Sequence, residues 1–175
     1  MSEHAVGLME EFGFEFDGSR MATDHLPVYV RNGDRWVKDG PFQFGELTDI
    51  VGIPVAWVMD DVPIFEFAWG QLSGLAPSAN AAEMWNGELD FAIKNCPGGV
   101  YNLTVHPQSI ARGARLGVLE ALLQRASEHP DVKFLRQSEY VDLWRANNPR
   151  EAWRKNNPEL AGDGSIRFLP SMARK

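Results

Sequence analysis

The sequence predicts an α/β protein with parallel strands, on three observations. From residue 53 onward, strand-like and helix-like segments alternate, which is the pattern of parallel strands joined by helices. Residues 53–59 (IPVAWVM) form a nearly continuous apolar run, as expected of a strand covered on both faces. The chain has 175 residues, which is enough for one domain with a core and too few for two comfortable ones.

The part before residue 53 predicts short elements separated by loops. Residues 3–12 place apolar side chains on one side of a helix, which Gly13 is suited to end. The stretch FEFDGS predicts a short strand and a turn. A strand is expected around 28–31, and a segment that pairs in extended form around 35–38.

The elements after the 53–59 strand follow in order. A helix is expected over 81–94 and ends at CPGG, and residues 99–105 alternate as a strand does. The clearest helix covers 110–127, where Leu and Ala repeat at helical spacing. A strand over 132–135 and a helix over 138–146 complete the alternation.

The last part of the chain predicts a tail that is either loosely ordered or wrapped on the surface. Residues 147–175 contain two NNP stretches and a GDGS. We therefore expect a folded portion over 1–146 and a tail over 147–175. Among the 6 tryptophans, Trp57 and Trp144 lie on apolar faces and are expected in the core, although such rings can also line a cleft for a sugar or a ring compound.

Charge and composition exclude several classes of function. A net charge of −7 disfavours a nucleic-acid partner, which would require clustered Lys and Arg. The chain shows neither a signal peptide nor an apolar stretch long enough for a membrane, so the expected location is the cytoplasm. Cys96 is the single cysteine, which excludes an intrachain disulfide.

Polar side chains follow two of the expected strands. Asp60 and Asp61 come after the first, and His106 comes after the next. Because parallel strands end at one edge, we expect these groups to lie together, where a carboxylate could orient a histidine suited to acid–base chemistry. The structural alternatives stay open: a histidine before proline often only finishes a strand, and an Asp-Asp pair before proline commonly forms a turn.

The sequence contains none of the common metal-binding or nucleophile motifs. There is no H-x-x-x-H, H-E-x-x-H or C-x-x-C spacing, no phosphate-binding loop and no G-x-S-x-G. Arg112 and Arg115 lie about one turn apart at the start of the 110–127 helix. They could hold a substrate anion or an acidic residue at the strand ends, but a structural salt bridge is the favoured interpretation.

Three segments together resemble the polysaccharide deacetylase, or NodB-homology, family. They are EEFGFEFDGSRMATDHLPVYV, IPVAWVMDDVPIFEF and YNLTVHPQSIARGARLGVLEALLQRASEHPDVKFLRQSEYVDLWR. The most similar branch includes peptidoglycan-deacetylase-like enzymes, cofactor-independent allantoinases and cyclic imide hydrolases. The resemblance reaches residue 146 and covers the C-terminal portion of the family's domain.

The resemblance implies a distorted (β/α) barrel that hydrolyses a carbon–nitrogen bond other than a peptide bond, in an acetamido sugar, amide or cyclic imide. His106 matches the family's late histidine, which protonates the leaving amine, and Asp60 and Asp61 match the acidic pair that supports it. Asp24 and Pro27 match the loop of the substrate cleft. Trp69 is a further expected substrate contact.

The sequence also departs from the family. Pro27 is followed by Val28 instead of tyrosine, and Asp61 by Val62 instead of tryptophan. The first two motifs, which carry the ligands of a zinc-like divalent metal, are absent from this sequence. We therefore expect a partial barrel that is inactive alone and that associates with itself or with a chain supplying the missing strands. The alternative is a non-catalytic module that keeps the cleft for binding.

Overall fold

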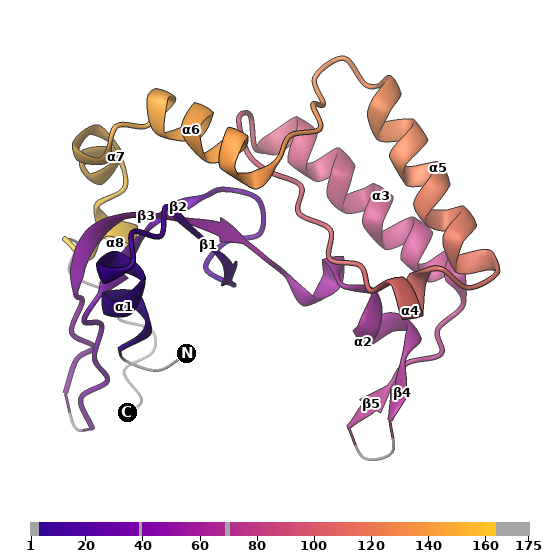
Figure 1. The fold of residues 1–175 in the computed structure, drawn as a ribbon, viewed down its shortest axis with the longest axis horizontal. Helices are drawn as coiled ribbons and strands as arrows, with labels where there is room; N and C mark the ends of the chain where they lie inside the picture. Colours follow the sequence, from indigo (N-terminus) through magenta and orange to yellow (C-terminus); the bar gives the residue numbers. More distant parts are fainter. Residues whose placement is uncertain (1–3, 39, 69–70, 164–175) are drawn as a thin grey trace, which may run out of the picture. The chain divides into compact units, whose positions relative to one another are not determined.

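The computed structural model describes residues 4–38, 40–68 and 71–163 (Figure 1). The elements are, in chain order, α1 (Ala5–Glu11), β1 (Phe16–Arg20), β2 (Val28–Asn32), β3 (Glu46–Pro54), the short 3-10 helix η1 (Trp57–Met59), α2 (Asp61–Phe65), β4 (Phe67–Ala68), β5 (Leu72–Ser73), α3 (Ser78–Asn95), α4 (Pro107–Ile110), α5 (Ala114–Glu128), α6 (Gln137–Asn147), α7 (Arg150–Asn156) and α8 (Pro158–Ala161). No helix in the described ranges is long and apolar enough to cross a membrane.

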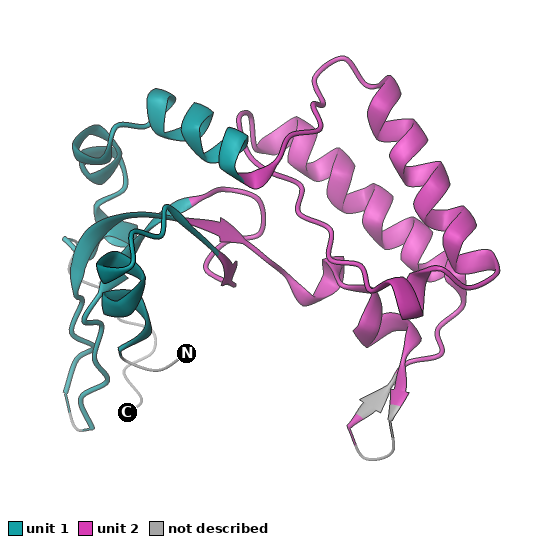
Figure 2. Cartoon of the chain, in the orientation of Figure 1, with its two compact units in different colours: residues 1–17, 28–51, 138–175 teal, residues 18–27, 52–137 magenta. Residues whose placement is uncertain are grey.

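The chain divides into two compact units, which Figure 2 distinguishes by colour. The first unit contains residues 1–17, 28–51 and 138–175. The second contains residues 18–27 and 52–137. The predicted division at residue 146 is a different one and stays a prediction.

Strands β1, β2 and β3, which all precede residue 55, form a three-stranded sheet in the order β1-β3-β2. Its central strand β3 carries the most buried apolar side chains, with Ile50, Val51 and Ile53 almost inaccessible to solvent. In the first unit, Ile50 joins Val6 of α1 and Val30 of β2 in a small core. The residues expected to form the first helix and the 28–31 strand do so, and Arg35 pairs with Gln43 in an isolated antiparallel bridge.

The alternative of a loosely ordered tail is wrong for residues 150–161. These form α7 and α8, and Trp153 of α7 is buried. Its ring packs edge-on against Tyr29 at 5.4 Å between centroids, and Trp144 of α6 lies on Tyr29 at 5.1 Å. Aromatic burial of this kind fixes a segment whose NNP stretches suggested loops. Residues 164–175 lie outside the described ranges.

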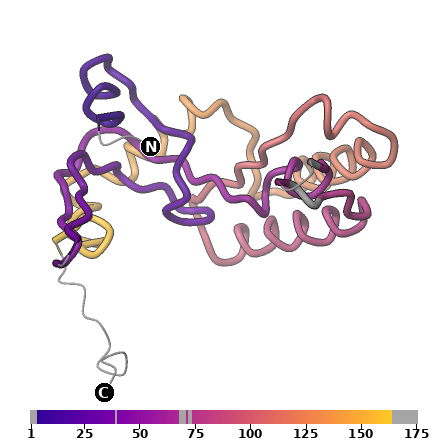
Figure 3. Tube along the Cα trace, turned by 90° about the horizontal axis from the view of Figure 1, so that it is seen from below, coloured from indigo at the N-terminus to yellow at the C-terminus, as the bar shows by residue number. Residues whose placement is uncertain are grey.

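The second unit is built on α3 and α5, which lie side by side in both Figure 1 and Figure 3. Their facing side chains form a core with α2 and α4. Its buried members are Phe65, Ala81, Trp85, Leu89, Ile110, Leu122 and Ala126. The expected 81–94 helix is confirmed as α3, and the periodicity of its apolar residues explains why Trp85 and Leu89 face inward.

Three of the predicted strands are wrong in whole or in large part. The 53–59 run is strand only up to Pro54, after which η1 exposes 63% of Trp57 and 42% of Val58, so Trp57 is not in the core. Proline cannot donate to a strand ladder, which favours an end to pairing there. Residues 99–105 form only one parallel bridge, from Thr104 to Asp60. Residues 132–135 form no strand.

The predicted helix over 110–127 is confirmed as α5, which begins later, at Ala114, while residues 107–110 form the separate helix α4 before a break that includes Gly113. Gly113 has φ of 49° and ψ of −126°, a conformation open to glycine and strained for other residues. This break separates α4 from α5 and turns the chain between them. The short α4 therefore has its own direction, which matters because His106 stands directly before it.

Candidate active site

Asp60 and Asp61 occupy the start of α2, where each has a different task. Asp60 has extended backbone and is the N-cap, and its Oδ1 accepts a hydrogen bond of 2.8 Å from the Val62 amide. This is the usual role of aspartate at a helix start. Asp61 is the first helical residue and is fully buried. The Asp-Asp pair is thus also a structural turn, as the alternative interpretation proposed.

His106 is brought to Asp61 by pairing between the two chain segments that precede them. The Thr104 amide donates to the Met59 carbonyl at 2.8 Å, and the Asp61 amide donates to the Thr104 carbonyl at 3.2 Å. These two bonds form the parallel bridge, so the segments run in the same direction and end at the same edge. The expectation that parallel segments bring the side chains at their ends together therefore holds for this one bridge, although no regular strand forms there.

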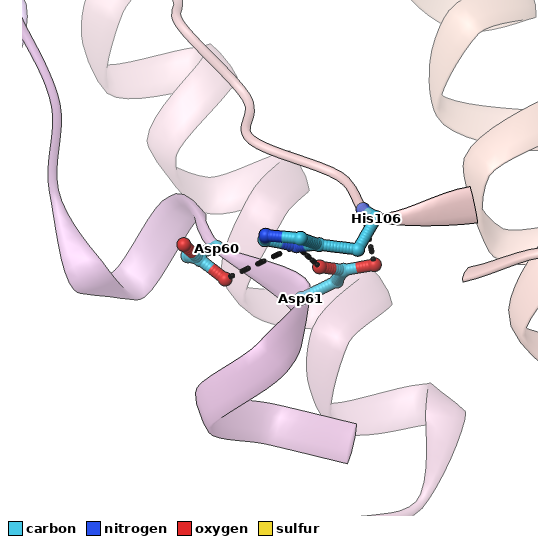
Figure 4. Close-up of side chains that lie close together, drawn as sticks. All are labelled: Asp60, Asp61 and His106. Atoms are coloured by element: carbon cyan, nitrogen blue, oxygen red, sulfur yellow. Dashed lines mark hydrogen bonds and ion pairs between the residues drawn. The ribbon is translucent and has the colours of Figure 1, made fainter. Parts of the chain in front are cut away.

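A buried carboxylate binds His106 twice. Asp61 Oδ1 lies 2.7 Å from the His106 ring atom Nδ1, and Asp61 Oδ2 accepts a bond of 2.9 Å from the His106 backbone amide (Figure 4). Asp60 Oδ1 lies 3.9 Å from the same Nδ1. The Asp61 side chain is 0% exposed and the His106 side chain 38% exposed, so a buried acid holds a histidine that solvent can reach.

This contact raises the pKa of His106 above its ordinary value. The first cause is the hydrogen bond from the ring to Asp61, which partial burial of the ring opposes, and the charges of Asp61 and Asp60 add to the rise. Because the carboxylate only accepts, Nδ1 carries the proton in both charge states of the ring. Within the described ranges no hydrogen bond is made by Nε2, which leaves that atom to exchange a proton with a ligand.

The remaining predicted site residues are not part of this cluster. Asp24 is exposed and Pro27 is buried. Neither appears among the hydrogen bonds and ion pairs that the structure gives to His106, Asp60 and Asp61 in the described part of the chain. Trp69 lies outside the described residues. The roles of Asp24, Pro27 and Trp69 in substrate binding stay predictions.

The three clustered side chains do not fit a metal ion as they are arranged. One ligand atom from each of Asp60, Asp61 and His106 can be chosen so that all lie within 4.8 Å of one another. However, Nδ1 and Asp61 Oδ1 are 2.7 Å apart, whereas two ligands of a tetrahedral zinc ion lie about 3.3 Å apart. Both Asp61 oxygens already accept from His106. The arrangement holds a proton between acid and imidazole.

Comparison with known proteins relates this chain to a group of hydrolases. No family model matches. A peptidoglycan deacetylase of Helicobacter pylori is 30% identical over 156 residues, which are 82% of this chain and 53% of that protein. A solved structure from Mycobacterium smegmatis, assigned to the polysaccharide deacetylases, superposes with a TM-score of 0.66 at 29% identity over 84% of this chain and 46% of that one. In sequence and in structure, the chain is similar to part of a polysaccharide deacetylase.

A second solved structure shows the same fold. The Puue allantoinase superposes with a TM-score of 0.60 at 22% identity, over 85% of this chain and 45% of that one. The expected fold, part of the α/β fold of polysaccharide deacetylases, is therefore confirmed, and the three-stranded sheet is not a closed barrel. The chain spans about half the length of the relatives that it matches.

Proposed function

We propose that this chain provides the acid–base histidine of a polysaccharide-deacetylase-like hydrolase of carbon–nitrogen bonds. The observation that carries the proposal is the doubly bonded Asp61–His106 pair, with a buried acid and an accessible ring. The relatives support the hydrolase class, since they are a peptidoglycan deacetylase and a protein assigned to the polysaccharide deacetylases. The substrates we propose are an acetamido sugar, an amide or a cyclic imide or ureide.

In this proposal His106 donates a proton from Nε2 to the nitrogen of the leaving amine. The raised pKa keeps a larger fraction of the ring protonated near neutral pH, so the acid is ready when the carbon–nitrogen bond breaks. Asp61 does not touch the substrate. It orients the ring, fixes the proton on Nδ1 and stabilises the imidazolium, while Asp60 adds negative charge from 3.9 Å.

The water-activating group of the reaction lies outside this cluster. A divalent metal, zinc-like in the family pattern, would polarise the scissile carbonyl and activate water, but the three described side chains are engaged as a hydrogen-bonded pair and a helix cap. We therefore propose that the metal ligands come from outside the described residues, and that the chain acts in a cytoplasmic assembly with itself or with a partner chain.

The proposal is tested by isolating the chain from its source together with whatever binds it. The isolated assembly and the chain alone are assayed with zinc on oligomers of N-acetylglucosamine, on allantoin and on a cyclic imide. We expect hydrolysis of at least one of them by the assembly and none by the chain alone. His106→Gln should then lower kcat at least about 100-fold, whereas His129→Gln, outside the cluster, serves as the matched control.

Two results would overturn parts of this proposal. Hydrolysis that survives His106→Gln unchanged removes the acid role. An assembly that binds the N-acetylglucosamine oligomers but hydrolyses none of the three substrates favours the alternative, a non-catalytic binding module.

A further inference from the structure

The two residues of the acid–base pair stand at the beginnings of two very short helices. Asp61 begins α2, which has 5 residues, and His106 caps α4, which has 4. Helices of this length have no stability of their own in water, because nucleation costs more than so few hydrogen bonds return. The distance between Asp61 and His106 therefore depends both on the backbone bridge before them and on the contacts that hold these two turns together.

A single arginine of α5 binds the far ends of both turns. Arg115 donates from one terminal nitrogen to the Phe65 carbonyl, the last residue of α2, at 3.0 Å. From the other it donates to the Ser109 carbonyl in α4 at 3.2 Å and to Glu66 at 3.1 Å. Carbonyl groups at helix ends lack partners within the helix and attract cations. The guanidinium supplies donors to both ends at once.

Arg115 is fixed in place by its other neighbours. Its guanidinium carbon lies 4.7 Å from the centroid of the Phe65 ring, which is itself buried in the core. Glu66 forms an ion pair with it, and the pKa of Glu66 is lowered, first by the nearby Ser109 hydroxyl and then by Arg115. Only a planar group with several fixed donors can make all these contacts together.

These engagements argue against a role for Arg115 in binding a substrate anion. Both terminal nitrogens already donate to protein acceptors, and one face of the guanidinium is covered by Phe65. The sequence-based preference for a structural salt bridge is confirmed for this residue. However, the partners lie at the ends of the turns that begin with Asp61 and His106, which gives the salt bridge a further consequence.

We propose that Arg115 is a positioning residue for the acid–base pair: it joins α2 to α4 and so keeps the Asp61 carboxylate against the His106 ring. This inference rests on the proposed function in so far as the pair is catalytic. The geometric part, the dependence of the Asp61–His106 contact on Arg115, stands on the structure of the second unit alone.

The test is a nuclear magnetic resonance titration of His106 in the full chain and in Arg115→Ala and Arg115→Lys. Removing a nearby positive charge raises the pKa of a histidine, whereas loss of contact with Asp61 lowers it. The two effects have opposite signs, so the direction is diagnostic. We expect the His106 pKa to fall by at least about 0.5 unit in Arg115→Ala, toward the ordinary value of about 6.5. Lysine keeps the charge but not the fork, and should restore only part of the shift.

Arg125→Ala is the matched control. Arg125 also lies on α5 and also joins it to another helix, through Asn86 at 2.7 Å and Asp90 of α3, but it touches neither α2 nor α4. It should lower the thermal midpoint of unfolding without moving the His106 titration. If Arg115→Ala does not fold, the comparison of Arg115→Lys with the unaltered chain decides the question by the same shift.

The outcomes separate this inference from the proposed function. A raised His106 pKa that persists in Arg115→Ala and Arg115→Lys overturns the positioning role and leaves the acid–base pair intact. A His106 that titrates at its ordinary value in the unaltered chain overturns both the pair and the inference. A fall in Arg125→Ala equal to that in Arg115→Ala shows a general loosening and also overturns the inference.

Discussion

Asp61→Asn tests how much of the site depends on one buried charge. The change keeps the shape of the side chain but removes its charge and one of its two acceptor atoms. Asp61 Oδ1 and Oδ2 accept from two His106 donors at 2.7 and 2.9 Å, so the asparagine must turn its NH₂ group toward one of them. A buried polar clash of this kind costs about 1–3 kcal/mol in the free energy of unfolding.

The effect on His106 follows from the same contact. The hydrogen bond to Asp61 is the first cause of the raised pKa of His106, so its loss should move that pKa down toward its ordinary value. The His106 side chain is 38% exposed, and solvent screening therefore limits the fall. The assay is a titration of the ring signals by nuclear magnetic resonance, with the four histidines assigned by substitution.

Asp60→Asn is the matched control for the charge. Its carboxylate is 3.9 Å from Nδ1 and contributes less to the pKa of His106 than Asp61 does, so its substitution should give the smaller fall. An unchanged His106 titration in Asp61→Asn would refute the idea that the buried carboxylate controls the ring.

Three further predictions concern pH and stability. Because the pKa of His106 is raised, its pairing with Asp61 contributes stability that is complete below about pH 6.5 and is lost as the pH rises through the higher folded-state pKa. His106→Gln should remove this pH dependence from the free energy of unfolding measured in urea. An identical pH dependence in both proteins would contradict the prediction. Trp85→Ala should lower the free energy of unfolding by about 3–5 kcal/mol, because the Trp85 ring is fully buried. Trp57→Ala should change it by less than about 0.5 kcal/mol, because the Trp57 side chain is 63% exposed. Equal midpoints of urea unfolding for the two variants would show that the core is misassigned. Gly113→Ala should destabilise the protein by about 1–3 kcal/mol, because the φ of Gly113 is +49°. Gly117→Ala should stabilise it by up to about 1 kcal/mol, because Gly117 lies within helix α5 with open space around it. Both changes are measured by thermal unfolding, and effects of the same sign would contradict this argument from backbone conformation.

The helices could be predicted from the sequence because their signal is local. Apolar residues at helical spacing in α3 and α6 mark the buried faces, and Trp85 and Trp144 face inward as that spacing requires. The strands could not be predicted in the same way. An apolar run such as 53–59 looks like a buried strand, but whether Trp57 finds a covering layer depends on the rest of the chain.

The site was predictable to the extent that it depends on two short stretches. The order of Asp60, Asp61 and His106 at the ends of two extended segments indicated their meeting, and one parallel bridge was enough to bring it about. The separate roles of the two aspartates were not predictable. Which of them caps α2 and which binds the His106 ring depends on the direction in which the chain enters α2. The partners of Arg115 are non-local, since Phe65 lies 50 residues away.

The most direct test of the account is the protonation pattern of the His106 ring, measured by nitrogen-15 chemical shifts in the full chain above the titration midpoint. The account predicts a neutral ring with its proton on Nδ1, held by Asp61, and an unprotonated Nε2. A ring that carries its proton on Nε2, or that exchanges between both forms, would contradict the claim that Asp61 orients His106 for proton transfer.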